Sequence, residues 1–224
     1  MKFCVIGLGI FGTNLARILT QLGAEVLAAD RDPDRVDALK DEVAHALILD
    51  ASDAKALRQL PLHDMDAVIV AIGEDFESSI LATAHLHELG IPNLICRSIN
   101  STHGRLLELL KVPKIILPER MAADRTARSL MLGRVNDAVA ISADFDIVEL
   151  PVPDHLVGRS LQAASLRDRY RLNLITIKRH SSTSTPDTPR FDVLGIIPPT
   201  HIFDSSDILL LFGKEVDIRR FLKD

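Results

Sequence analysis

The sequence GLGIFG at residues 7–12 constrains this chain more than any other segment. It follows an apolar run at residues 3–6 and opens a stretch of apolar residues at helical spacing. In such a strand–turn–helix unit, Gly7 permits the tight turn, Gly9 lets the backbone approach a pyrophosphate, and Gly12 allows close packing of helix on strand. The phosphates then lie at the helix N-terminus. The pattern predicts a dinucleotide-binding loop.

A carboxylate stands where such a loop needs one. A second apolar run, residues 25–29, ends at Asp30, the position from which a side chain can accept hydrogen bonds from both ribose hydroxyls. A carboxylate there repels a 2′-phosphate, so the residues favour NAD or an adenine nucleotide over NADP, although Arg31 is adjacent. The competing interpretation is a glycine turn that only tightens an α/β corner.

Apolar runs and helical patterns alternate through the first half of the chain. We expect strands at 3–6, 25–29, 46–49, 67–71, 93–96 and 114–117, with helices between them. This order predicts a Rossmann-type, doubly wound parallel sheet whose ligand crevice lies at the carboxyl ends of the strands, between the first and the fourth. The residues that follow the strands are therefore the candidate binding residues: Gly7, Gly9, Ile10, Phe11, Gly12, Asp30, Arg31, Asp50, Ala51, Ile72, Gly73, Glu74, Arg97 and Glu119.

The second half predicts a smaller α+β domain. Residues 122–132 form an amphipathic helical pattern, and 133–144 is a less periodic connector, so we place the domains at 1–133 and 134–224. The expected elements are strands at 147–150, 174–178, 191–197 and 208–212, a helical pattern at 161–170 and a final helix from Val216. Residues 180–190 are rich in Ser, Thr and Pro and predict a solvated hairpin loop.

The composition excludes several classes of protein. A formal net charge of −5, no Trp and one Tyr argue against a nucleic-acid surface. No apolar run reaches the roughly 20 residues that span a bilayer, and no signal-peptide pattern follows Met1, so we expect a cytosolic protein. Cys4 and Cys96 are expected on the first and fifth strands, separated by the fourth, as buried and reduced thiols. We expect no intrinsic His/Cys metal site.

An NAD-dependent oxidoreductase would need an acid or base near the nicotinamide. The second half offers His155, His180 and His201, but none forms a spaced set with a carboxylate on one element. Binding without catalysis is the simpler interpretation, and the oxidoreductase is kept as the alternative, with a stand-alone nucleotide sensor as a third possibility.

Several segments together resemble the domain that regulates the conductance of potassium, the RCK domain. They are residues 7–12, 26–30, 50–53, 68–73 and 117–119 in the first half, and 158–161, 166–170, 175–178 and 207–213 in the second. The resemblance covers essentially the whole chain. It is strongest to the cytosolic regulatory subunits of bacterial Ktr and Trk potassium-uptake systems.

This resemblance implies a non-enzymatic subunit whose dimers assemble into an octameric ring beneath a membrane potassium channel or transporter. ATP or ADP, or NAD(H) in the Trk branch, would set the shape of the ring. By matching positions, the three glycines would take the phosphates, Asp30 the ribose, and Asp50 and Ala51 the adenine side. Arg97 would take the phosphate tail. Glu119 would lie near the phosphates at the dimer interface, where some members bind a divalent cation such as Mg²⁺.

Three positions depart from the family pattern. Ile10 stands where members of the Ktr branch commonly carry Arg, so the resemblance implies a weaker preference for ATP over ADP than Arg would give. Arg171 replaces a frequent Gly, and Ser206 precedes Asp207. Some relatives bind cyclic di-AMP in the second domain. In this chain the residues that would line that pocket are Arg169, Asn173 and Pro198, for which loop or core roles are the competing interpretation.

Overall fold

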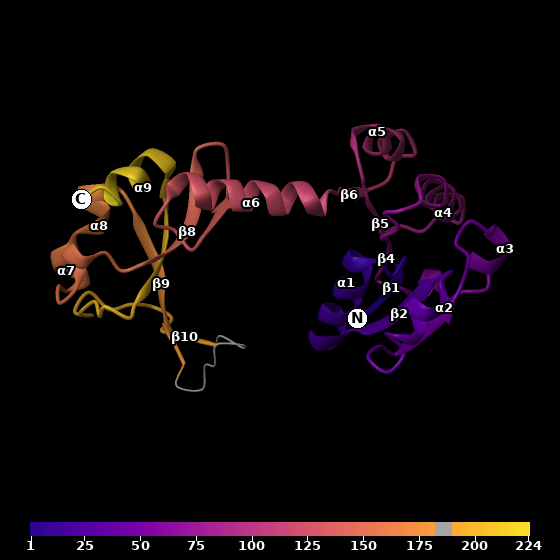
Figure 1. Ribbon diagram of the computed structural model, residues 1–224, viewed down its shortest axis with the longest axis horizontal. Coiled ribbons are helices and arrows are strands. Elements are labelled where there is room, and N and C mark those ends of the chain that lie inside the picture. Colours follow the sequence, from indigo (N-terminus) through magenta and orange to yellow (C-terminus); the bar gives the residue numbers. More distant parts are fainter. Residues whose placement is uncertain (182–189) are drawn as a thin grey trace. The chain divides into compact units, whose positions relative to one another are not determined.

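A computed structural model describes residues 1–181 and 190–224 of the chain. These residues form two compact units, Met1–Pro118 and Glu119–Asp224, each with its own core. Figure 1 labels the elements of each unit. The expected loop at 180–190 falls mostly on residues 182–189, which lie outside the described residues.

The N-terminal unit is a six-stranded parallel sheet in the order β3-β2-β1-β4-β5-β6. Apolar strands buried on both faces require helices on both sides, and separate apolar clusters lie on the two faces. The doubly wound fold predicted from the sequence is confirmed. Its strands are β1 (Lys2–Ile6), β2 (Glu25–Asp30), β3 (His45–Ile48), β4 (Ala67–Val70), β5 (Leu94–Arg97) and β6 (Lys114–Ile116). Its helices are α1 (Ile10–Gln21), α2 (Pro33–Asp37), α3 (Ala54–Leu57), η1 (Leu62–Asp64), α4 (Phe76–Glu88) and α5 (Ser101–Leu109).

The two cysteines lie as expected. Cys4 pairs with Val68 across β1 and β4, and Cys96 pairs with Val70 across β4 and β5, so β4 separates the thiols. Both thiols are buried and free. Burial raises the pKa of Cys4 to about 12 and that of Cys96 to about 11, so both stay protonated at neutral pH.

The C-terminal unit is an antiparallel sheet in the order β10-β9-β11-β8-β7, with short helices around it. Its core includes Tyr170, Phe203 and Phe221, and the Tyr170 and Phe221 rings meet edge to face with their centroids 5.0 Å apart. The strands are β7 (Asp137–Ala140), β8 (Phe145–Pro151), β9 (Asn173–His180), β10 (Phe191–Val193) and β11 (Ile208–Lys214). The helices are α6 (Pro118–Leu132), η2 (Asp154–Leu156), α7 (Leu161–Ala164), α8 (Leu166–Tyr170) and α9 (Glu215–Phe221).

Three expectations for this half were wrong in detail. The connector contains β7, whose four residues pair with β8 and are too few for a periodic signal. The helical pattern at 161–170 is two helices, because Ser165 adopts a left-handed φ of 49° that ends α7. The strand expected at 191–197 stops at Val193, before Gly195, whose φ is +71°.

Helix α6 begins at Pro118, four residues before the expected start, because proline is favoured in the first turn of a helix. Arg125 donates to the Asp137 carboxylate through Nε and Nη2, with Nε 2.6 Å from Oδ1, and Arg128 Nη1 lies 3.2 Å from Asp146 Oδ1. In a single chain, α6 therefore packs with the second unit, whereas the sequence analysis grouped it with the first. The bounds 1–133 and 134–224 stay a prediction.

The opposite face of α6 is apolar, and its side chains are exposed among the described residues. Leu130 is 77% exposed and Met131 is 68% exposed, while Ala123 and Ala127 on the same helix are also exposed. The polar side of the helix thus contacts the chain's own second unit, and the apolar side faces outward.

Candidate functional site

The glycine loop joins β1 to α1 in the geometry that its sequence predicts. Gly7 has a φ of +95°, and its amide donates to the Ala29 carbonyl at 2.8 Å. A Cβ on Gly12 would overlap the Gly7 carbonyl oxygen, so only glycine fits there. Around Gly9 there is room, since the nearest atom to a Cβ would be Nη1 of Arg35 at 3.8 Å. Gly12 is therefore needed for packing, whereas Gly9 leaves the loop open to an incoming group.

Asp30 ends β2 and holds the loop. Its Oδ2 accepts a hydrogen bond from the Leu8 amide at 2.5 Å, and its Oδ1 accepts one from the Asp32 amide at 2.8 Å. The carboxylate is largely buried. Each carboxylate oxygen has a second lone pair, so the group can still accept from ribose hydroxyls.

Arg97, at the end of β5, lies beside the loop on the other side. A Cβ at Gly73 would overlap its guanidinium, so the glycine makes room for the cation. The same guanidinium lies 5.8 Å from the centroid of the Phe11 ring. Ile72 packs against the loop as well, because a Cβ on Gly7 would lie 2.8 Å from both its Cγ1 and its amide nitrogen.

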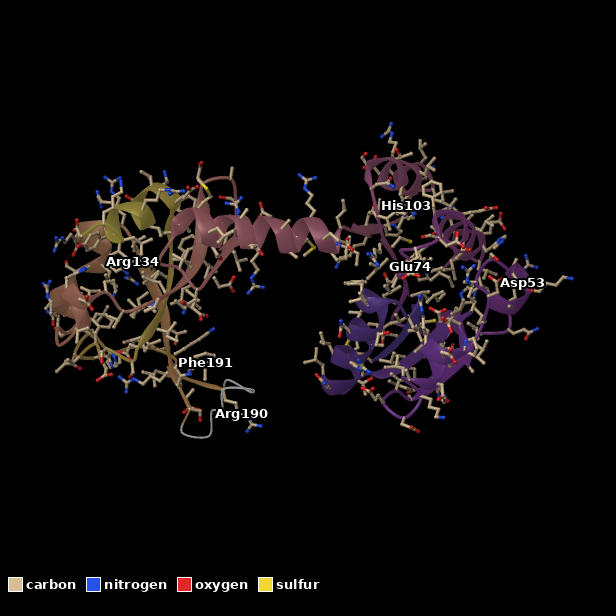
Figure 2. The ribbon with its side chains drawn as sticks, viewed as in Figure 1. Asp53, Glu74, His103, Arg134, Arg190 and Phe191 are labelled. Carbon is tan, nitrogen blue, oxygen red and sulfur yellow. The ribbon has the colours of Figure 1, made fainter. Side chains whose placement is uncertain are left out.

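Two ion pairs connect the β2 side of the crevice with the β4 side. Arg31 Nη1 lies 3.0 Å from Asp75 Oδ2, and Arg35 Nη2 lies 2.8 Å from Glu74 Oε2. The hydrogen bond to Glu74 raises the pKa of the Arg35 guanidinium. Glu74 can be found among the side chains of the N-terminal unit in Figure 2. Arg35 is a binding candidate that the sequence analysis missed, because it lies on a short helix outside the fingerprint.

Asp50 follows β3 on the far side of β2. Its Oδ1 accepts hydrogen bonds from the Ser52 hydroxyl at 2.6 Å and the Ser52 amide at 2.9 Å. These bonds, with a smaller contribution from the positive charge of Arg31, lower the pKa of Asp50. Asp50 is therefore an ionised acceptor at neutral pH, and Ala51 beside it is buried.

The remaining predicted residues are distributed as follows. Ile10 is the first residue of α1 and is 88% exposed. Glu119 lies in the first turn of α6, in the second compact unit. Within residues 1–181 and 190–224, no group of three or more His, Cys, Asp or Glu is placed to hold a metal ion.

Three residues of the C-terminal unit were considered for binding a cyclic dinucleotide, and the side chains of two of them make hydrogen bonds within the unit. Arg169 Nη2 donates to Asp224 Oδ2 at 3.0 Å, and Asn173 Oδ1 accepts from Arg167 Nε at 2.8 Å. Pro198 is exposed, and its carbonyl accepts from the His201 amide at 3.0 Å.

A polar cluster in this unit went unnoticed in the sequence. Asp207 is buried and accepts from Arg179 Nε at 2.5 Å, and it lies 3.3 Å from His201 Nε2. The Asp204 amide donates to it as well, at 2.9 Å. Desolvation by burial is the largest single effect and raises the pKa of Asp207. The hydrogen bonds from these partners and the positive charge of Arg179 together outweigh it, so the pKa is lowered. The cluster ties the segment before β11 to β9.

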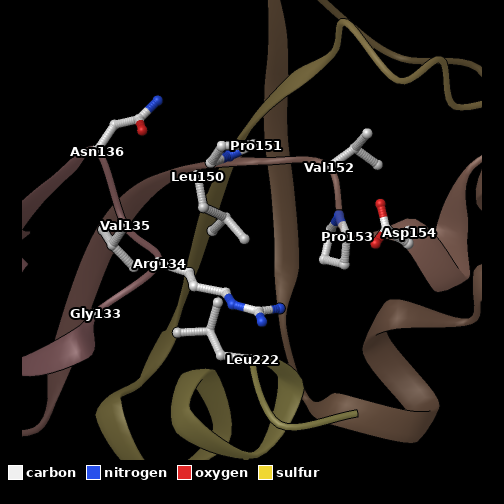
Figure 3. Close-up of a pocket in the computed structure, with 10 residues that line it drawn as sticks. All are labelled: Gly133, Arg134, Val135, Asn136, Leu150, Pro151, Val152, Pro153, Asp154 and Leu222. Atoms are coloured by element: carbon white, nitrogen blue, oxygen red, sulfur yellow. The ribbon is translucent and has the colours of Figure 1, made fainter.

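A cavity of about 380 Å³ also lies in the C-terminal unit. It is lined by the segment 133–136 after α6, by the end of β8 with the residues that follow it, and by Leu222 just after α9. Arg134 extends into it while Asn136 points away (Figure 3). None of the predicted site residues lines it.

Comparison with known proteins places the chain in a family. Residues 3–118 match the TrkA-N domain. The chain belongs to the TrkA-N domain family. It is 34% identical over 224 residues to the Ktr system potassium uptake protein C of Bacillus subtilis, covering 99% of this chain and 96% of that protein. It is 33% identical over 220 residues to the Ktr system potassium uptake protein A of the same organism, covering 98% and 95%. The resemblance noted in the sequence is thus confirmed.

Solved structures agree on the fold of this TrkA-N protein. The RCK domain of GsuK superposes with a TM-score of 0.61 at 15% identity, covering 97% of this chain and 46% of that one. The structure titled "GsuK channel bound to NAD" gives 0.60 at 16% identity, covering 97% and 38%. The NAD(P)-binding domain of an exopolyphosphatase-related protein from Archaeoglobus fulgidus gives 0.50 at 28% identity, covering 58% and 93%.

Proposed function

We propose that this chain is a nucleotide-sensing regulatory subunit of a potassium-uptake system. The main support is the geometry of the glycine loop. Gly12 is packed against the Gly7 carbonyl, the space around Gly9 is free for a phosphate, and Asp30 accepts a hydrogen bond from the loop backbone. The role in potassium uptake is supported by family membership, since two curated relatives that span the chain are named Ktr system potassium uptake proteins.

The ligand in this proposal is an adenine nucleotide with a pyrophosphate. ATP or ADP is the first choice and NAD(H) the alternative, which the NAD-bound GsuK channel supports by its fold. Gly7, Gly9 and Gly12 would present the helix N-terminus to the phosphates, and Asp30 would accept from the ribose. Asp50 and Ala51 would border the adenine. Arg97, beside Gly73 and Phe11, would face the phosphate tail.

A divalent cation such as Mg²⁺ would accompany the nucleotide, with Glu119 as one of its ligands. The family resemblance is the support for this role. Cyclic di-AMP is a secondary candidate ligand for the second domain, where it would have to displace the bonds of Arg169 to Asp224 and of Asn173 to Arg167.

The partners in this proposal are a second copy of the chain and a membrane potassium channel or transporter subunit. The outward apolar face of α6 supports self-association into the dimers of an octameric ring. Among the helices of the described residues, none is long and apolar enough to cross a bilayer. Attachment to the inner face of the cell membrane would therefore come through the partner.

Regulation without catalysis fits the site better than hydride transfer does. The polar groups of the crevice are backbone amides, carboxylates that accept hydrogen bonds, and arginines. Amides and arginines suit phosphates, and carboxylates suit ribose hydroxyls. The competing proposal is an NAD-dependent oxidoreductase, which needs an acid or base beside the nicotinamide.

Titration calorimetry of the purified protein with ATP, ADP and NADH tests the proposal. We expect saturable binding of at least one of them, and no oxidation of NADH by the protein when an artificial electron acceptor is supplied. Gly9→Ala is the control, since a Cβ there blocks the close approach of a pyrophosphate. No binding of any of the three ligands would overturn the proposal, and turnover of NADH would favour the oxidoreductase.

A further inference from the structure

Arg35 reaches the glycine loop from the β2 side. Its Nη1 is the atom nearest to a Cβ position at Gly9, at 3.8 Å, where the backbone is open to a pyrophosphate. Helix α2, which carries Arg35, begins three residues after the end of β2. The Arg35 guanidinium therefore lies beside the glycine loop. The first turn of α1, which begins at Ile10, contributes no positively charged side chain of its own.

The partner of Arg35 comes from the opposite side of the crevice. Glu74 follows β4, and the sheet order places β1 and its glycine loop between β2 and β4. The 2.8 Å ion pair between Arg35 and Glu74 therefore crosses the mouth of the loop. Glu74 is thus paired with the cation that lies nearest to the Cβ position of Gly9.

The strength of this pair is modest. Glu74 is 76% exposed and Arg35 is 36% exposed, so water screens their attraction. The phosphate chain of ADP or ATP carries more negative charge than a single carboxylate, and it can pair with Arg through two parallel hydrogen bonds, as a carboxylate can. An incoming phosphate can therefore replace Glu74 at little cost, whereas Asp32, with its Oδ2 3.4 Å from Arg35 Nε, can stay in place.

We propose that Arg35 binds the nucleotide phosphates and that Glu74 competes with them for it. The inference rests on the proposed nucleotide binding and adds a regulation of that site. Affinity then rises with the charge of the phosphate chain, because a more highly charged ligand displaces Glu74 more completely.

Calorimetry at one ionic strength tests this with ATP, ADP and adenosine on wild type, Glu74→Gln, Arg35→Gln and the double variant. Glu74→Gln should tighten ATP and ADP by about 3- to 5-fold and leave adenosine unchanged. Arg35→Gln should weaken ATP and ADP about 10-fold or more. In the double variant, the gain from Glu74→Gln should disappear.

Glu77→Gln is the matched control. Glu77 is an exposed carboxylate in the first turn of α4, so its substitution changes the net charge equally without touching Arg35. Equal effects of Glu74→Gln and Glu77→Gln, or a gain from Glu74→Gln that persists beside Arg35→Gln, would overturn the competition while wild-type binding still upheld the proposed function. Absence of nucleotide binding in wild type and every variant would overturn both.

Discussion

The Leu8 amide donates a hydrogen bond of 2.5 Å to Oδ2 of Asp30. The side chain expected to hold a ribose thus also holds the glycine loop. The other carboxylate oxygen, Oδ1, accepts one hydrogen bond from the Asp32 amide at 2.8 Å. Asp30 therefore links the end of β2 to the loop after β1, and we expect loss of its carboxylate to affect both the loop and nucleotide binding.

Replacing Asp30 with alanine should weaken ADP and ATP by about 1.5–3 kcal/mol, the range for lost hydrogen bonds to a charged group. It should also lower the melting temperature, because the Leu8 amide loses its partner. Calorimetry and a thermal melt measure the two effects. Asp37→Ala, an exposed carboxylate on α2, is the control and should change neither affinity nor melting. Wild-type affinity for ADP, ATP and NADH alike in Asp30→Ala would remove this residue from the site.

Two glycine substitutions should separate folding from binding. Gly12→Ala should destabilise the N-terminal unit severely, since its Cβ would overlap the Gly7 carbonyl oxygen. Gly9→Ala should change stability by no more than about 1 kcal/mol, because its Cβ meets nothing closer than 3.8 Å, yet it should abolish nucleotide binding. Circular dichroism melts and calorimetry of both variants give the comparison. Nucleotide binding by a folded Gly9→Ala variant would contradict the assignment of the phosphates to this loop.

Asp207 should make the C-terminal unit sensitive to acid. Its pKa in the folded chain lies below the ordinary value of 3.8, so its stabilisation is complete above that pH and is lost as the pH falls through the folded value. Asp207→Asn should cost about 3 kcal/mol at pH 7, because it leaves Arg179 without its buried partner, and less at pH 3. Denaturant titrations at both pH values measure this. Asp192→Asn, exposed on β10, is the control, and a cost for Asp207→Asn that does not shrink in acid would refute the assignment.

Leu130→Asp should disrupt self-association without unfolding the chain. Leu130 is 77% exposed in the single chain, so the substitution disturbs nothing within it, whereas an unpaired carboxylate in a subunit interface costs roughly 3 kcal/mol or more. Light scattering at micromolar concentration should show the loss of the oligomer. The control is Val216→Asp, which replaces an exposed apolar residue on a different helix, α9, and should leave the oligomer intact. A wild type that remains monomeric with and without nucleotide would rule out the ring.

The parallel sheet was predictable because its information is local. Each apolar run followed by a glycine or a carboxylate specifies one strand and its end, and the resulting order brings Gly7, Asp30 and Gly73 to one crevice. Arg35 was missed because its position above Gly9 depends on the path of α2, a five-residue helix with no periodic signal. The Asp207 cluster was missed for a similar reason, since its members come from β9 and two turns.

The irregular elements of the second half were less accessible. A left-handed Ser165 has no residue signature comparable to glycine, so the break between α7 and α8 follows from packing and not from a local rule. The short strand β7 exists because β8 offers it a partner along four residues. In both cases the tertiary context decides, and the local sequence is compatible with more than one outcome.

The most direct test of the regulatory role is potassium uptake by the organism of origin after deletion of this gene. Complementation with wild type should restore uptake. Complementation with Gly9→Ala, which we expect to fold but not to bind the phosphates, should leave uptake unresponsive to the cell's nucleotide state. Glu77→Gln should behave as wild type. Uptake that is unchanged by the deletion, or that Gly9→Ala restores with full nucleotide response, would contradict the account.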